Sequence, residues 1–164
     1  EDADYHNAVF VGRDSNGNTR HIHKRSTMSG STFKGNAEAS DPEFSFNWRG
    51  HSNRLFVFEA PIDMLSYISL HPNGWQKNSY VSLCSTAGIA AIKMLQDNPH
   101  INTIYLCLDN DNAGNVGSEK IAEKIHSIGD YEVWRLYPEN KDWNEDLISI
   151  KEQEIKNKIT IGGI

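Results

Sequence analysis

The stretch TIYLCLDNDNAG, residues 103–114, decides the fold that we expect for this chain. Within it Ile104–Leu108 is an unbroken apolar run, which stops at Asp109 and Asp111. Such a run is typical of a strand in a parallel sheet that helices cover on both faces. Because residues two apart in an extended chain point the same way, both carboxylates should project from the carboxyl end of this strand. Ligands of open α/β sheets bind at that end.

Two neighbouring carboxylates repel each other unless a proton or a cation lies between them. Carboxylate and water oxygens are the ligands that Mg²⁺ prefers. The stretch therefore predicts a metal site at the tip of the strand, built on Asp109 and Asp111, with Mg²⁺ or Mn²⁺ as the cofactor.

The composition predicts a single domain, or one domain with a small subdomain. The chain has 164 residues, of which 38% are apolar, and this is enough for a core. Nothing approaches 18 consecutive apolar residues, so we expect no membrane span. The sequence opens with Glu1 and without the apolar core of a signal peptide, and we interpret it as a piece of a longer cytoplasmic protein. Cys84 and Cys107 lie inside apolar runs, which predicts buried, reduced thiols.

Charge is distributed unevenly along the chain. The net charge of −6 argues against a general nucleic-acid coat protein. However, Val11–Lys34 holds five basic residues and one acid, whereas the part from Arg54 onward holds fifteen acids and ten bases. This pattern favours a protein that holds a polyanion at its front end and metal ions in the remainder.

We expect residues 1–52 to form a small, basic, β-rich subdomain. Strands are predicted at 8–12 and 20–26 around an Asn-Gly turn, followed by a loop over 28–42 and a third strand at 44–48. On the second strand His21 and His23 share one face, and we expect both to be exposed and to bind no metal.

In residues 53–164 predicted strands alternate with predicted helices. The strands are expected at 55–58, 80–84, 104–108 and 131–137, and the helices at 61–70, from 85 to 96, at 113–128, and from 141 into a fraying tail. This alternation predicts an α/β fold with a mostly parallel, Rossmann-like sheet flanked by helices. The strand at 131–137 alternates in polarity and should lie nearer an edge.

Three acids, Glu59, Asp109 and Asp111, each follow a predicted buried strand. A glutamate after the first such strand and a DxD after the third resemble the Toprim domain, which bacterial primases, type IA and II topoisomerases and some nucleases share. The primase branch is the nearer match, because DNDNAG at 109–114 is similar to the primase DxDxAG. EAPID at 59–63 resembles the primase EGYMD, and KDWNEDL at 141–147 resembles the primase segment that begins with Lys-Asp.

The resemblance covers most of the chain and is closest to primase-like Toprim proteins of plasmids, phages and integrative elements. It implies a Toprim fold preceded by the β-rich subdomain. The sequence departs from the pattern where Ala60 and Pro61 replace Gly and Tyr, and where Ser85 replaces Gly before Thr86. It contains neither a zinc ribbon nor a Walker A motif. Any template-reading or motor part must therefore lie elsewhere or be missing.

The resemblance also implies roles for particular residues. The catalytic trio is Glu59, Asp109 and Asp111, and Asp142 joins these three as a metal ligand. Whether Glu59 binds metal or accepts the proton of the attacking hydroxyl stays open. The residues expected to bind nucleic acid or nucleotide are Arg25, Lys34, Ser85, Thr86 and Lys141, and those expected to support the site are Asp63 and Gly114.

Structural roles are open for several of these residues. Asp142 and Glu145 are spaced to cap the last helix, and Asn112 is the expected N-cap of the helix after the DxD. Ser85 and Thr86 are expected to cap a helix or to touch a phosphate. Asp63 suits a first helical turn, where acids complement the dipole.

Three functions compete. The first is a primase-like nucleotidyltransferase that uses nucleotides and a single-stranded DNA or RNA template. The second is a Toprim nuclease with water as the nucleophile. The third is a non-catalytic nucleic-acid-binding module of a mobile-element protein. A helicase or other domains of a longer parent protein are the expected further partners.

Overall fold

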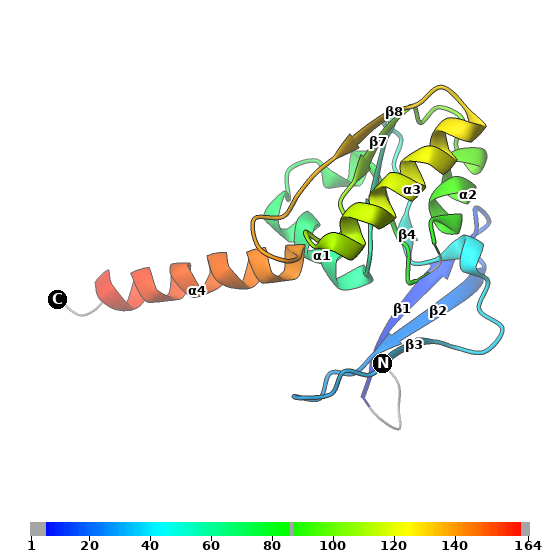
Figure 1. The fold of residues 1–164 in the computed structure, drawn as a ribbon. Helices are drawn as coiled ribbons and strands as arrows, with labels where there is room; N and C mark the ends of the chain where they lie inside the picture. The colour runs from blue at the N-terminus through cyan, green and yellow to red at the C-terminus, as the bar shows by residue number, and fades with distance from the viewer. Residues whose placement is uncertain (1–5, 86, 162–164) are drawn as a thin grey trace.

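The structure, a computed structural model, describes residues 6–85 and 87–161. Its strands are β1 (Ala8–Arg13), β2 (Thr19–Arg25), β3 (Lys34–Asn36), β4 (Asn47–Trp48), β5 (Arg54–Phe58), β6 (Ser79–Ser82), β7 (Thr103–Leu106) and β8 (Glu132–Arg135). Its helices are α1 (Pro61–Leu70), α2 (Ile89–Asp97), α3 (Asn112–Ile128) and α4 (Trp143–Ile161), with short 3₁₀ turns η1 (Pro42–Phe44) and η2 (Trp75–Lys77). The strands form two sheets (Figure 1).

The first sheet is antiparallel, in the order β1-β2-β3. The predicted hairpin forms because the Asp14 carboxylate accepts the backbone N–H groups of Asn16 and Asn18, which closes the turn. The predicted loop over 28–42 is wrong in part, since β3 lies within it and pairs with the end of β2.

The expectation that His21 and His23 are exposed is also wrong. They are 1% and 6% exposed, respectively. His23 lies opposite Phe10 on β1, and the Phe10 ring packs on Phe46 with ring centroids 5.5 Å apart. This face of the small sheet therefore packs against the segment that leads into the second sheet, which buries both histidines.

The third strand predicted at 44–48 is shorter than expected and belongs to the other sheet. Pro42 starts the η1 turn, and the Asp41 side chain caps it by accepting the N–H of Glu43 at 3.1 Å. Only Asn47 and Trp48 are extended, and they pair antiparallel with β6.

The second sheet has the order β4-β6-β5-β7-β8. Its last four strands along the chain are parallel, as predicted, and β8 lies at the edge. β5 is central and β7 lies beside it. The strand β7 ends at Leu106, two residues earlier than the apolar run suggested, although Cys107 and Leu108 stay buried.

Helices cover both faces of this sheet. One apolar cluster joins alternate strand residues to α2 and α3, and its buried members include Leu55, Val57, Met94, Ile104, Leu106, Ile121 and Ile125. The cluster on the other face includes Phe56, Phe58, Met64, Cys107 and Trp143, from the strands, α1 and the start of α4. Cys84 and Cys107 are buried free thiols, as expected.

α4 does not fray into the lysine-rich tail, contrary to our expectation. It continues to Ile161 and extends away from the sheets (Figure 1). Pairs such as Lys151–Glu154, with 2.9 Å between Nζ and Oε2, lie one turn apart on the surface of such a helix and favour its formation. Across the described ranges, we find no helix with both the length and the apolar content needed to cross a bilayer.

Candidate metal centre

The predicted trio lies at the carboxyl ends of two neighbouring parallel strands. Val57 of β5 is in register with Leu106 of β7. Glu59 follows β5 directly, and Asp109 and Asp111 follow β7. The charge of Asp142, before α4, raises the pKa of Asp109. The charges of Asp142 and Asp109 in turn raise the pKa of Asp63 in the first turn of α1. We call the five residues Glu59, Asp63, Asp109, Asp111 and Asp142 the acidic edge.

Asp109 shows how strongly these charges interact. The pKa of Asp109 is raised to about 6, first by burial and then by the charges of Glu59, Asp142 and Asp111, in that order of importance. The ammonium of Lys141 acts in the opposite direction. Each of these acids thus disfavours the charge of Asp109, and a bound cation would relieve this repulsion.

Asp63 is the buried member of the acidic edge. Its pKa is raised to about 7, first by burial and then by the charges of Asp142 and Asp109. A hydrogen bond from the backbone N–H of Asn144, at 3.4 Å, and the charge of Arg25 lower it. Asp63 therefore joins α1 to the start of α4 and is partly protonated near neutral pH.

This leads to a prediction for Asp63→Asn. In the unfolded chain Asp63 loses its proton near pH 3.8, the ordinary pKa of an aspartate, whereas in the folded chain it keeps the proton up to about pH 7. Between these two pH values the unfolded state therefore binds fewer protons than the folded state. Stability should therefore fall as pH rises through this window. The asparagine keeps an acceptor oxygen for Asn144 but does not titrate. We expect the variant to be more stable by about 4 kcal/mol at about pH 8 and nearly equal to the wild type near pH 4.

Urea unfolding of the metal-free chain at both pH values measures this effect. The matched control is Asp130→Asn, which changes an exposed aspartate in the turn before β8, at the opposite end of the strands. Equal stabilisation of the two variants at the higher pH would contradict the assignment to Asp63.

Asp111, rather than the expected Asn112, is the N-cap of α3. Its Oδ1 accepts the backbone N–H of Gly114 at 2.8 Å, and Asn112 is the first helical residue. The capping bond orients the Asp111 carboxylate and occupies one of its two oxygens. The second oxygen is still available to a metal ion.

Gly114 lies against the backbone of Asp109. An added Cβ at this position would overlap the Asp109 carbonyl oxygen. The absence of a side chain lets the start of α3 approach the strand end that carries the DxD.

Asp142 and Lys141 belong to the loop between β8 and α4. Asp142 Oδ1 accepts the N–H of Glu145 at 2.8 Å, so Asp142 caps α4 as the spacing suggested. The carbonyl oxygen of Lys141 accepts the N–H of Asn110 at 2.7 Å. This bond ties the loop to the DxD segment and brings Asp142 to the acidic edge.

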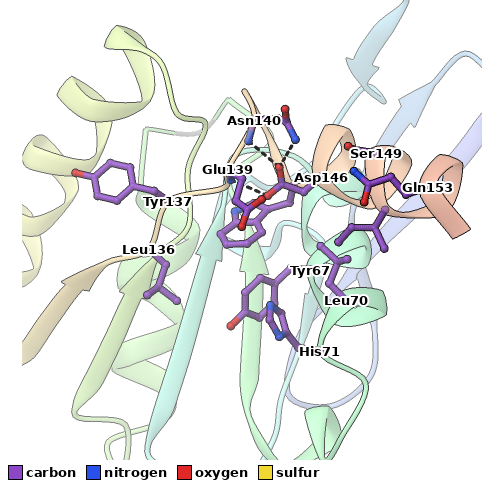
Figure 2. A pocket seen from close by; sticks show the side chains of 12 residues that line it. Tyr67, Leu70, His71, Leu136, Tyr137, Glu139, Asn140, Asp146, Ser149 and Gln153 are labelled. Carbon is purple, nitrogen blue, oxygen red and sulfur yellow. Dashed lines mark hydrogen bonds between the residues drawn. The ribbon is translucent and has the colours of Figure 1, made fainter.

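Sequence reasoning missed Asp146, which shapes this loop. Its carboxylate accepts the backbone N–H groups of Glu139 (2.9 Å) and Asn140 (2.7 Å) and the side-chain amide of Asn140 (2.8 Å). Figure 2 shows these bonds at the wall of a pocket of about 590 Å³ between α1, the segment after β8, and α4. Tyr67, His71 and Trp143 also line the pocket, but no predicted site residue does.

Arg25 and Lys34 lie directly opposite each other, at the end of β2 and the start of β3. Both are exposed. The effect of Arg25 on the pKa of Asp63 shows that this end of the small sheet is within electrostatic reach of the acidic edge.

Ser85 does not cap α2, which corrects our expectation. The N-cap is Gly88, because the chain adopts left-handed conformations at Cys84, Ser85, Ala87 and Gly88 before the helix begins. Thr86 lies outside the described residues. Ser85 is exposed in the loop that follows β6.

The donor chemistry of the acidic edge fits Mg²⁺ or Mn²⁺, because it consists of carboxylate oxygens. Within residues 6–85 and 87–161, no three side chains of His, Cys, Asp and Glu converge into a ready-made metal cluster. Mg²⁺ is commonly held by one or two carboxylates together with waters and substrate phosphates. The assignment of metal ligands stays a prediction.

Residues 56–147, which run from β5 to the first turn of α4, match a family described as Toprim-like. The chain belongs to the Toprim-like family. Residues 1–52 match a second family, described as a protein of unknown function, DUF3991. The division of this Toprim-like protein into domains at residues 52 and 53 stays a proposal.

Several solved structures share the fold. The primase fragment of the bacteriophage T7 primase-helicase is similar with a TM-score of 0.69 and 22% identity, over 92% of this chain and 61% of that one. The E. coli primase catalytic core has a TM-score of 0.63 and 18% identity, over 89% of this chain and 48% of that one. A DnaG primase catalytic domain bound to single-stranded DNA has a TM-score of 0.64 and 15% identity, over 94% and 51% of the two chains.

A curated relative is an uncharacterized protein of Bacillus anthracis, pXO2-78. The two sequences are 22% identical over an alignment 173 residues long, which covers 92% of this chain and 50% of that protein. The Toprim-like chain thus spans about half the length of this relative.

Proposed function

We propose that this Toprim-like chain is a primase-like catalytic core, which joins nucleotides on a single-stranded template with Mg²⁺ or Mn²⁺. The observation that carries the proposal is the coupling of Glu59 to Asp109 across neighbouring parallel strands. The negative charge of Glu59 contributes to the raised pKa of Asp109, which is about 6. The fold shared with the primase structures supports the same function.

In phosphoryl transfer the protein mainly positions groups and neutralises charge. Asp109, Asp111 and Asp142 would hold the metal, with Glu59 as a further ligand or as acceptor of the proton from the attacking hydroxyl. When bound, the cation stabilises the attacking and leaving oxygens. Lys141 lies on the loop tied to the DxD segment and would pair with a phosphate.

The proposal is tested by incubating the chain with single-stranded DNA, labelled nucleotides and Mn²⁺, and resolving the products on a gel. Labelled oligonucleotides longer than the supplied nucleotides are the expected result. Shorter fragments without any need for nucleotides would indicate a nuclease. Strand binding without any change of length would indicate a module that lacks catalysis.

The paired cations of the small sheet lead to a separate prediction. If Arg25 and Lys34 contact the phosphate backbone, Arg25→Ala and Lys34→Ala should each weaken binding of single-stranded DNA. Each should also flatten the plot of log affinity against log salt by about 0.7, the share of one phosphate contact on a single strand.

Fluorescence anisotropy over a range of salt concentrations measures both quantities. The control is Arg13→Ala, because Arg13 lies at the other end of the small sheet, beside the hairpin turn, and donates to the carbonyl oxygen of Gly17 at 2.8 Å. Slopes that equal the wild type for both Arg25 and Lys34 variants would remove this pair from the binding face.

A further inference from the structure

Arg135, the last residue of β8, turns its guanidinium onto the backbone that follows β7. Its Nη1 donates to the carbonyl oxygens of Leu106 (3.0 Å), Leu108 (2.9 Å) and Leu136 (2.7 Å). Its Nη2 donates to the carbonyl oxygen of Asp109 at 2.8 Å. One side chain thus binds backbone carbonyl groups at the end of β7, in the segment that leads to the DxD, and directly after β8.

The segment that Arg135 holds lies beyond the regular sheet. The ladder between β7 and β8 ends with the pair Leu106 and Arg135, so the carbonyl groups of Leu108 and Asp109 lie past its last rung. Buried carbonyl groups need a donor from another source. The indole Nε1 of Trp143 donates to the carbonyl oxygen of Cys107 at 2.8 Å. Arg135 donates to the carbonyl oxygens of Leu108 and Asp109.

The guanidinium is itself held in place. It lies 4.5 Å from the centroid of the Tyr137 ring and packs over its face. A planar guanidinium presents its donors in a rigid fork, which a lysine ammonium does not. The position of Arg135 therefore restricts the backbone conformation at Asp109, and with it the direction of the Asp109 side chain.

We propose that Arg135 is a positioning residue of the candidate metal centre, which sets the direction of the Asp109 carboxylate by fixing the carbonyl groups of Leu108 and Asp109. This inference rests on the proposed function, because Asp109 is the metal ligand that is positioned. Arg135 donates to the backbone of Asp109, and its charge also interacts with the carboxylates of Asp109 and Glu59. Replacement of Arg135 by lysine keeps that charge and removes only the fork of donors. Groups that orient metal ligands typically change metal affinity by about 10- to 100-fold when they are altered.

The test uses the full chain and the variant Arg135→Lys, with Mn²⁺ binding measured by electron paramagnetic resonance. We expect affinity to fall by about tenfold or more, because an ammonium cannot reach all the carbonyl groups that the fork holds. The matched control is Arg49→Lys. Arg49 follows β4 at the opposite edge of the sheet and also donates to a backbone carbonyl oxygen, that of Arg13, at 2.9 Å.

A second measurement needs no metal. Hydrogen exchange of the metal-free chain should become faster in residues 107–111 of Arg135→Lys, with the peptides of β5 and α2 unchanged. If Arg135→Lys fails to fold, as judged by circular dichroism, Arg135→Gln takes its place in both measurements.

The possible outcomes separate the two proposals. Unchanged exchange at residues 107–111, or Mn²⁺ affinity equal to the wild type, overturns the positioning role alone. A wild-type chain that binds no Mn²⁺ overturns the proposed function, and the positioning role fails with it. Faster local exchange together with weaker Mn²⁺ binding, both absent in Arg49→Lys, supports Arg135 as the positioning residue.

Discussion

Asp109→Asn is expected to lower Mn²⁺ affinity, and with it the proposed nucleotidyl transfer, by at least about 100-fold. Altering a group that only orients a metal ligand lowers affinity by about 10- to 100-fold, and loss of the ligand itself should cost at least as much. The same variant should keep its fold, with stability unchanged or higher by up to ~2 kcal/mol at neutral pH. Loss of function without loss of stability follows from the electrostatics of the site. Because the pKa of Asp109 is raised to about 6, its charged form opposes folding near neutral pH, and the amide removes that charge.

Three measurements check this prediction: Mn²⁺ affinity, formation of labelled oligonucleotides, and thermal unfolding with and without metal. Metal should raise the melting temperature of the wild type and have little effect on Asp109→Asn, since only a bound ligand stabilises the folded state. Asp130→Asn serves as the control and should behave as the wild type. A large loss of stability in Asp109→Asn with an unchanged response to metal would count against the site.

Gly114→Ala is expected to cause the largest loss of stability, about 2–4 kcal/mol. The added methyl group would overlap the carbonyl oxygen of Asp109, which is backbone and cannot rotate away. Either α3 or the DxD segment must move, so metal binding should weaken together with stability. This joint loss distinguishes the variant from Asp109→Asn, in which only metal binding should suffer.

The matched control is Gly117→Ala on the same helix. Its added Cβ would lie 3.3 Å from Cδ2 of Leu108, which is a side-chain atom that can shift. Alanine also favours a helix over glycine by about 1 kcal/mol, so we expect little net change in stability. Urea unfolding of both variants measures the difference. Equal stability of Gly114→Ala and Gly117→Ala would show that α3 does not need its close approach to Asp109.

Several features of the fold were predictable because they depend on local sequence. The run Ile104–Leu108 indicated burial on both faces, and its residues do divide between the two apolar clusters. Pro61 marked the start of α1, and Gly129 the end of α3. The alternating strand at 132–135 does lie at the edge of the sheet.

The burial of His21 and His23 was not predictable in the same way. A polar strand that alternates His with Arg, Ile and Lys resembles an exposed one, and only the packing of Phe10 on Phe46 shows that the histidine face is covered. The placement of β4 in the larger sheet is a similar case, because pairing partners of a two-residue strand come from distant sequence.

The amino-acid sequence alone determined which acids follow buried strands, since hydrophobic runs and the residues that interrupt them are local properties. It pointed in this way to Glu59, Asp109 and Asp111 and to the Toprim-like fold. The tertiary structure alone decided what surrounds those acids. Arg135 and Asp146 form hydrogen bonds with backbone groups. Because nearly every residue type carries these groups, no pattern in the sequence predicts which residues they bind. These contacts arise only where separate elements meet.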